Sequence, residues 1–244
     1  MRRKILITGA AGRIGSFLVE NLAERYELVL TDIRQPHETY GFPFHRADIG
    51  SIEFMRQVSQ GVEVVVHLAA NPNEKAPWEK IYPANVVGVH NVFQAAVDSG
   101  CKRVVFASSI HVVQGYPAEV QVAPSMSVRP LNIYGAAKAW GEALARYYAD
   151  QQQISMICLR FGWVFHREDL NIKPNHADLN MVITLDDLAR LVSASIEAPY
   201  NLHFGIFHGL SNNSRKRLDI SSTCEILGYK PRDDAFAIAE ERKK

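Results

Sequence analysis

The chain has 244 residues, of which 47% are hydrophobic and 22% are charged, a composition that suits one α/β domain with a sizeable core. Its 27 Lys and Arg residues against 26 Asp and Glu residues give no reason to expect a nucleic-acid partner. No stretch approaches the roughly 20 apolar residues of a membrane span, and the apolar run near the start is shorter than the roughly 7–15 residues of a secretion signal. The three cysteines are far apart, so we expect neither a disulfide framework nor a cysteine-rich zinc site. Without an expected secretion signal, membrane span or disulfide framework, we expect a cytoplasmic protein.

Apolar runs of strand length alternate with helical stretches along the first two thirds of the chain. We expect strands at residues 4–8, 27–32, 63–69, 103–108 and 155–161. Helices are expected between them, at residues 13–25, 51–58, 81–99 and 134–151. Most of the strands are continuously apolar, so the pattern predicts a Rossmann-type doubly wound parallel sheet covered on both faces.

After residue 161 the pattern weakens. Residues 164–180 are rich in Asn, His, Asp and Pro and are expected to be mostly loop. A helix at 184–197, a strand at 203–210 and a helix at 220–227 follow. We therefore predict a Rossmann core over residues 1–162 and a small substrate-covering lobe over 163–244, with elements that pack back on the core.

The first expected strand runs into a glycine-rich turn, Gly9-Ala10-Ala11-Gly12-Arg13-Ile14-Gly15, which opens a helix. Glycines at these spacings allow a tight turn, a close approach to a pyrophosphate and packing of the helix on the sheet. The free N–H groups at the helix start attract phosphates. The turn therefore predicts a dinucleotide site.

Asp32 ends the second expected strand, 17 residues after Gly15. A carboxylate there accepts hydrogen bonds from the adenosine ribose and repels a 2′-phosphate, so we expect NAD, with kcat/KM higher than for NADP. Arg34 instead favours NADP, because an arginine near this position can accommodate the 2′-phosphate.

Tyr134 and Lys138 lie four residues apart at the start of an expected helix and share one face. A phenol has a pKa of about 10, and a neighbouring ammonium favours the phenolate. Lys138 can therefore bring Tyr134 closer to the working range of an acid/base and can also bind the nicotinamide ribose. Ser108 and Ser109 end the fourth strand, where a hydroxyl can orient the substrate oxygen.

Together with the segments at 66–70, 85–96, 106–109 and 159–162, these motifs resemble the extended short-chain dehydrogenase/reductases, the NAD-dependent epimerase/dehydratase family. Within it, the chain looks most like uronate dehydrogenases and related NAD-dependent sugar 1-dehydrogenases, which oxidise C1 of a sugar or sugar acid to a lactone. The resemblance implies that Ser109 is the catalytic hydroxyl and that Tyr134 is the acid/base. It further implies that the cofactor contacts Gly9, Gly12, Arg13, Ile14, Gly15, Asp32, Ile33, Arg34, Asp48, Ile49, Leu68, Ala69, Ala70, Asn85, Tyr134 and Lys138. For Asn85 the resemblance implies a place in the supporting hydrogen-bond network, and a helix cap after Pro83 is an equal alternative.

The resemblance implies that the substrate contacts Asn71, Ser109, His111 and Trp163. The chain also departs from the uronate dehydrogenase pattern, because Ile110, Trp163 and Pro72 replace polar residues and no arginine falls at the expected carboxylate-binding position. Arg167 or Lys173 could substitute for that arginine. The changes predict a less polar or differently shaped pocket, and leave open which sugar is the substrate.

Three functions are compared on these grounds. The first is a sugar 1-dehydrogenase, and the second is another enzyme of the same branch, a sugar epimerase or a carbonyl reductase. The third is a non-catalytic NAD-binding sensor, which typically lacks the Tyr/Lys pair. Nucleotide-sugar enzymes need a larger C-terminal lobe than the roughly 80 residues here, and the Tyr/Lys pair is present, so the first function is favoured.

The remaining expectations concern partners and single residues. No HExxH or similar motif indicates a metal, and we expect neither a nucleic-acid nor a membrane partner. His67, inside an apolar strand, is expected in the core.

In the family the helices containing Asn85 and Tyr134 commonly form a homodimer interface. The apolar face formed by Trp140, Leu144, Tyr147 and Tyr148 fits either that interface or the protein's own core.

Overall fold

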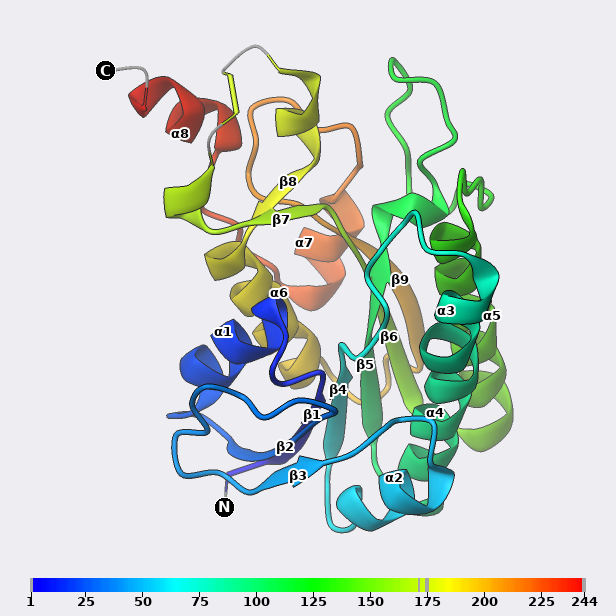
Figure 1. The fold of residues 1–244 in the computed structure, drawn as a ribbon. Helices are drawn as coiled ribbons and strands as arrows, with labels where there is room; N and C mark the ends of the chain where they lie inside the picture. The colour runs from blue at the N-terminus through cyan, green and yellow to red at the C-terminus, as the bar shows by residue number, and fades with distance from the viewer. Residues whose placement is uncertain (1, 171, 174–175, 243–244) are drawn as a thin grey trace.

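The computed structural model describes residues 2–170, 172–173 and 176–242, and within them seven strands form one parallel sheet (Figure 1). Their spatial order is β3 (Phe44–Arg46), β2 (Glu27–Asp32), β1 (Lys4–Thr8), β4 (Val64–His67), β5 (Arg103–Ser109), β6 (Ser155–Phe161) and β9 (Phe204–Gly209). The order reverses between β1 and β4. In such sheets, ligands bind beyond the carboxyl ends of the strands at this switch point.

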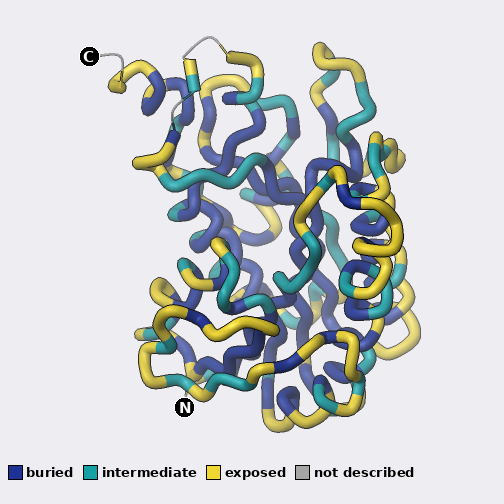
Figure 2. Tube along the Cα trace, in the orientation of Figure 1, coloured by how far each residue is buried: buried dark blue, intermediate teal, exposed yellow. Residues whose placement is uncertain are grey.

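Helices cover both faces of the sheet (Figure 1). One layer holds α1 (Arg13–Leu22) and α6 (Leu185–Glu197), and the other holds α2 (Ile52–Val58), α4 (Val89–Asp98) and α5 (Ile133–Gln152). Successive strand residues enter opposite cores: Ile5 and Ile7 pack toward α1 and α6, whereas Leu6 packs toward α2 and α4. The central strands β4, β5 and β6 are buried along their whole length and β1 and β2 along nearly all of it (Figure 2), so the predicted doubly wound fold is confirmed.

The helix expected at 81–99 differs from the structure at its start. The chain forms α3 (Trp78–Tyr82), then a π-helical segment over Pro83–Gly88, and then α4. Pro83 has no N–H for the helix ladder, and its ring crowds the carbonyl four residues before it. A π-helical segment at this point accommodates that disruption.

The C-terminal part contains most of the expected elements. Thr184 caps α6 by accepting a hydrogen bond from the backbone N–H of Asp187, and α7 (Ser221–Leu227) ends at Gly228, whose φ of 67° is left-handed. The strand expected at 203–210 is β9, which joins the main sheet beside β6.

Three short elements were not expected from the sequence, besides the edge strand β3. They are β7 (Trp163–Phe165), its partner β8 (Val182–Thr184) and α8 (Ala235–Glu241), grouped at the top of Figure 1. The expected loop at 164–180 therefore contains most of β7 and the 3₁₀ turns Arg167–Asp169 and Ala177–Met181. A strand of three residues is too short to show a recognisable alternation of apolar and polar residues in the sequence. Asn171, Pro174 and Asn175 of that region lie outside the described residues.

No helix within the described ranges is both long and apolar enough to cross a membrane.

Candidate active site

A cavity of about 890 Å³ lies at the carboxyl ends of β1, β2, β4, β5 and β6. Ligand sites commonly measure about 300–1,000 Å³, so this cavity has room for a large cofactor. Of the residues predicted to contact the cofactor, those that line it are Gly9, Gly12, Arg13, Ile14, Gly15, Asp32, Ile33, Arg34, Asp48, Ile49, Leu68, Ala69, Ala70, Tyr134 and Lys138. The predicted substrate contacts that line it are Asn71, Ser109, His111 and Trp163.

The glycine turn brings backbone against backbone at one end of the cavity. Gly9 has a φ of 75°, and a Cβ there would lie 2.7 Å from the backbone nitrogen of Ala69. A Cβ on Gly15 would collide with the carbonyl oxygen of Gly9. The start of α1 therefore packs closely on the sheet, and Gly12 provides no side-chain cap, which leaves the first N–H groups of the helix to a phosphate.

Asp32 is fixed at the end of β2 with only 9% of its surface exposed. Its two carboxylate oxygens accept hydrogen bonds from the backbone nitrogens of Ala11 (3.0 Å) and Arg34 (2.9 Å). A carboxylate oxygen has more than one acceptor site, so a ribose hydroxyl can still donate to it. The Arg34 side chain is exposed, with Nε 4.0 Å from Asp32 Oδ1.

The predicted Tyr/Lys pair lies where α5 begins. The Asn132 side chain caps this helix by accepting a hydrogen bond from the Gly135 backbone N–H (2.7 Å). Tyr134 is half-buried on the cavity wall, and Lys138, one turn later, is buried with its Nζ donating to the Ala107 carbonyl at 2.6 Å. The cation is therefore held below the phenol ring, 5.7 Å from its centre.

Burial shifts the pKa values of both groups. It raises the pKa of Tyr134 to about 12, an effect that the Ser109 side chain opposes and the Glu74 carboxylate reinforces. It lowers the pKa of Lys138 to about 8, and the Glu142 carboxylate opposes this change. Below pH 8 the lysine is thus mainly charged and favours the phenolate form of Tyr134.

A buried ionic network lies beneath this pair. Glu142, one turn after Lys138, accepts hydrogen bonds from Arg160 Nε (2.8 Å) and from the second guanidinium nitrogen (2.7 Å). Ser108 Oγ donates to the same carboxylate at 2.6 Å. The network joins α5 to the ends of β5 and β6, and so fixes the strand end that presents Ser109.

Asn85 does not line the cavity. It lies within the π-helical segment, with its Oδ1 accepting from the Asn71 backbone N–H (2.8 Å) and its Nδ2 donating to the Asn71 carbonyl (3.1 Å). Asn85 therefore belongs to a supporting hydrogen-bond network, as the resemblance implied, and does not cap a helix. A side chain that bonds the loop cannot at the same time close the helix start. Direct contact with the cofactor stays a prediction.

His67 is fully buried, as expected, and its Nδ1 pairs with Thr8 Oγ1 at 2.7 Å. Burial lowers its pKa to about 3, so the ring is neutral near pH 7.

At the substrate end, His111 lies between two aromatic rings. Its ring meets Tyr134 edge-on at 5.4 Å and Trp163 edge-on at 5.2 Å. Pro72 and Ile110 also line this end, which agrees with the expected decrease in polarity. Arg167, considered as a carboxylate-binding group, instead forms an ion pair with Asp233 at 2.7 Å, and Lys173 is exposed; neither lines the cavity.

Three residues of this region were not predicted from the sequence: Asn132, Glu142 and Glu74. Asn132 could have been found, because asparagine just before a helical run is a common N-cap. Glu142 lies four residues after Lys138, but its burial against Arg160 depends on strand order. Glu74, on the loop after β4, contacts His111 only through the fold.

An open parallel sheet with a glycine turn at its switch point and a Tyr/Lys pair at the cavity wall defines a short-chain dehydrogenase/reductase. The model of the NAD-dependent epimerase/dehydratase family matches residues 5–199. The chain therefore belongs to this family, whose cofactor is NAD. The glycine turn and Asp32 at one end of the cavity, and Tyr134 and Lys138 at the other, suit that cofactor.

Comparisons with individual proteins agree with the family. The chain is 32% identical to the NAD-dependent glucose-6-phosphate dehydrogenase of Haloferax volcanii, over 96% of this chain and 95% of that protein. It is 31% identical to the L-arabinose 1-dehydrogenase (NAD(P)(+)) of the same organism, over 97% and 99%. A crystal structure of a tyrosine-to-alanine variant of Agrobacterium tumefaciens uronate dehydrogenase, complexed with NAD, has a TM-score of 0.89 and 30% identity, over 100% of this chain and 89% of that one.

Proposed function

We propose that this protein is an NAD-dependent dehydrogenase that oxidises C1 of a sugar or sugar acid to a lactone. The observation that carries the proposal is that Ser109, Tyr134 and Lys138 line the end of the cavity opposite Asp32 and the glycine turn. The similar proteins named above act on sugars or uronates, which supports the substrate class.

Tyr134 acts as the acid/base of this reaction. NAD, when bound, accepts the hydride that leaves C1. The phenolate of Tyr134 takes the proton of the C1 hydroxyl while the C1–O double bond forms, and Ser109 holds the oxygen by a hydrogen bond. The Lys138 cation stabilises the phenolate until the proton arrives.

The experiment that tests the proposed function follows NADH formation from NAD with a panel of free aldoses, uronic acids, sugar phosphates and simple alcohols. We expect turnover with free sugars or sugar acids, a lactone or its hydrolysed acid as product, and a higher kcat/KM with NAD than with NADP. The matched control is a 1,5-anhydro sugar, which lacks the C1 hydroxyl and is expected to give no NADH.

Two outcomes would contradict the proposal. NADH formation from the simple alcohols alone would indicate a carbonyl reductase working in its reverse direction. NAD binding with no turnover of any compound would favour the sensor.

Residues 163–244 are proposed to cover the substrate, with Trp163 and Val164 lining the cavity and α6 and β9 packing on the core. A cytoplasmic location is part of the proposal and rests on the sequence alone; cell fractionation would check it.

We also propose a homodimer through the α3 to α5 face. The expected aromatic face is divided: Tyr148 is buried and bonds Gln94, whereas Trp140 and Tyr147 are exposed. Other exposed apolar residues of α3 and α5 are Trp78, Tyr82 and Ile133. Single exposed apolar residues are ordinary, but a group of five on adjacent helices fits a symmetric interface.

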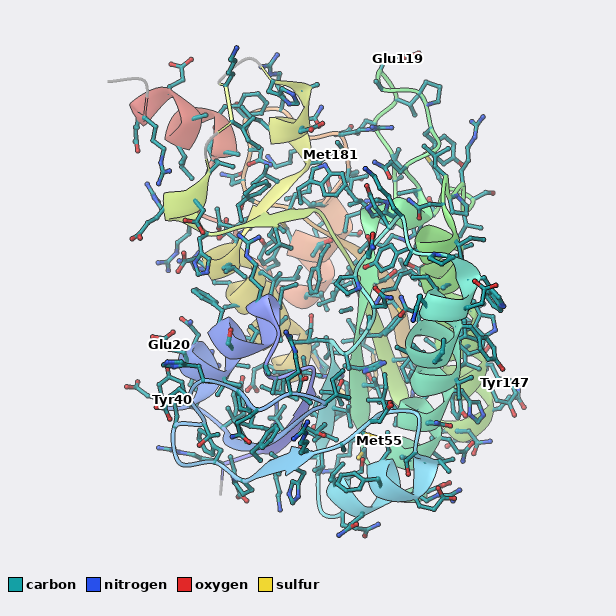
Figure 3. All side chains as sticks on the ribbon, in the orientation of Figure 1. Glu20, Tyr40, Met55, Glu119, Tyr147 and Met181 are labelled. Atoms are coloured by element: carbon teal, nitrogen blue, oxygen red, sulfur yellow. The ribbon has the colours of Figure 1, made fainter. Side chains whose placement is uncertain are left out.

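The double change Trp140→Glu and Tyr147→Glu is therefore expected to convert a dimer into a monomer in sedimentation equilibrium. Tyr147 projects outward on the opposite side of the molecule from Tyr40, so Tyr40→Glu is the control and is expected to leave the mass unchanged (Figure 3). A wild-type protein that sediments as a monomer at all concentrations would contradict the proposal.

A further inference from the structure

A carboxylate lies beside the substrate end of the cavity. Glu74 belongs to the loop between β4 and α3, and its Oε2 is 3.0 Å from the Nε2 of His111. The His111 side chain is buried and lines the cavity, whereas Glu74 is 40% exposed. The ring of His111 thus connects the carboxylate to Tyr134 and Trp163.

The hydrogen bonds around His111 determine its protonation. The Gly135 N–H donates to Asn132 Oδ1, so the Asn132 amide nitrogen faces His111 Nδ1 at 3.0 Å. An amide NH₂ is a donor, so Nδ1 is the acceptor and the proton lies on Nε2, which is 3.0 Å from Glu74 Oε2. Burial also lowers the pKa of His111, although Glu74 and Gln114 oppose this. The histidine is therefore neutral near pH 7, and the negative charge of Glu74 is not cancelled.

The cations on the cavity wall lie either at the cofactor end or beneath Tyr134. Within the described residues the cationic side chains that line it are Arg13, Arg34 and Lys138. Arg13 and Arg34 lie at the glycine turn and beside Asp32, the cofactor end. Lys138 Nζ is bound to the Ala107 carbonyl below Tyr134.

Apart from Lys138, the cavity-lining side chains beside His111 at the substrate end are uncharged. Asn71, Pro72, Ile110 and Trp163 line it, and the indole can contact the apolar face of a sugar ring. The Lys138 cation lies at this end beneath Tyr134, whereas the Glu74 carboxylate does not line the cavity itself and reaches this end beside His111.

We propose that Glu74 is a specificity-determining residue that selects a neutral aldose over the sugar acid or sugar phosphate of the same configuration. The carboxylate repels an anionic substituent and is able to accept hydrogen bonds from sugar hydroxyls. This inference rests on the proposed function, sugar oxidation at C1.

The test compares substrates of the same configuration that differ at C6, where one is neutral and the other anionic: galactose with galacturonate, and glucose with glucuronate and glucose 6-phosphate. We expect wild-type kcat/KM to be higher for the neutral sugar in each set. In Glu74→Gln, which keeps the size of the side chain but removes its charge, the neutral-to-anionic ratio is expected to fall about tenfold. Added salt is expected to reduce the wild-type ratio, because Glu74 is partly exposed and screened.

Glu79→Gln is the matched control. Glu79 is an exposed carboxylate on α3, five residues further along the chain, and His111 pairs with Glu74 instead, so its replacement is expected to leave the ratio unchanged. Turnover with a preference for the anionic sugar in every set, or an equal change for both sugars in Glu74→Gln, would overturn the selectivity alone. No NADH from any sugar, with NAD binding intact, would overturn the proposed function and the selectivity with it.

Discussion

Replacing Tyr134 by phenylalanine is expected to lower kcat/KM for sugar oxidation by roughly 10²–10⁴-fold, the usual contribution of a positioned acid/base. The change removes one hydroxyl and keeps the ring that packs edge-on against His111. NAD affinity, measured by calorimetric titration, is expected to remain, because the glycine turn and Asp32 lie at the other end of the cavity.

The pH dependence gives the same prediction a second measurement. Burial raises the pKa of Tyr134 to about 12, so the phenolate fraction increases as pH rises from neutrality. Wild-type oxidation is therefore expected to accelerate from neutrality to about pH 8 and then to level off, because Lys138, whose pKa burial lowers to about 8, loses the charge that stabilises the phenolate. The residual rate of Tyr134→Phe is expected to lose that rise. Tyr147→Phe, on the same helix but exposed, is the control. A Tyr134→Phe variant with the full rate would refute the acid/base role.

Replacing Glu142 by glutamine is expected to lower the free energy of unfolding by about 3–5 kcal/mol, because it leaves the Arg160 charge buried without its partner. The side chains of Glu142 and Arg160 are only 3% and 2% exposed, so water cannot replace the lost contact. Urea denaturation measures the loss. Oxidation is also expected to slow. Ser108 donates to Glu142 and Lys138 donates to the Ala107 carbonyl, and these bonds hold the end of β5 beside Tyr134.

Two further variants separate burial from charge pairing. Arg146 and Asp150 form an exposed pair on the same helix, and Asp150→Asn is expected to cost at most about 0.5 kcal/mol. Replacing Glu142 and Arg160 together by methionine removes both charges and is expected to restore much of the stability. A loss below about 1 kcal/mol in Glu142→Gln would contradict the role of the buried pair.

The sequence by itself determined the sheet and the cofactor end of the site. Continuous apolar runs predicted β1, β2, β4, β5 and β6, because a strand buried on both faces must be apolar throughout. The glycine turn, with Asp32 after the next strand, indicated NAD, because these features are local: a backbone that approaches phosphate closely needs glycine at fixed spacing. Tyr134 and Lys138 were also readable, since four residues span about one helical turn.

The tertiary structure decided the rest of the site. The strands β3, β7 and β8 are three residues long and form only by pairing with distant neighbours, so no sequence period predicts them. Asn85 was expected either in a supporting hydrogen-bond network or as a helix cap, and only the fold decided between them by placing it against the Asn71 loop. Glu74 meets His111, and Glu142 meets Arg160, only because loops and strands far apart in the chain reach the same sheet edge. Charge and burial at the substrate end depend on many such contacts between distant segments. The cofactor could therefore be predicted from local sequence motifs, whereas the preference for a neutral sugar could be proposed only from the fold.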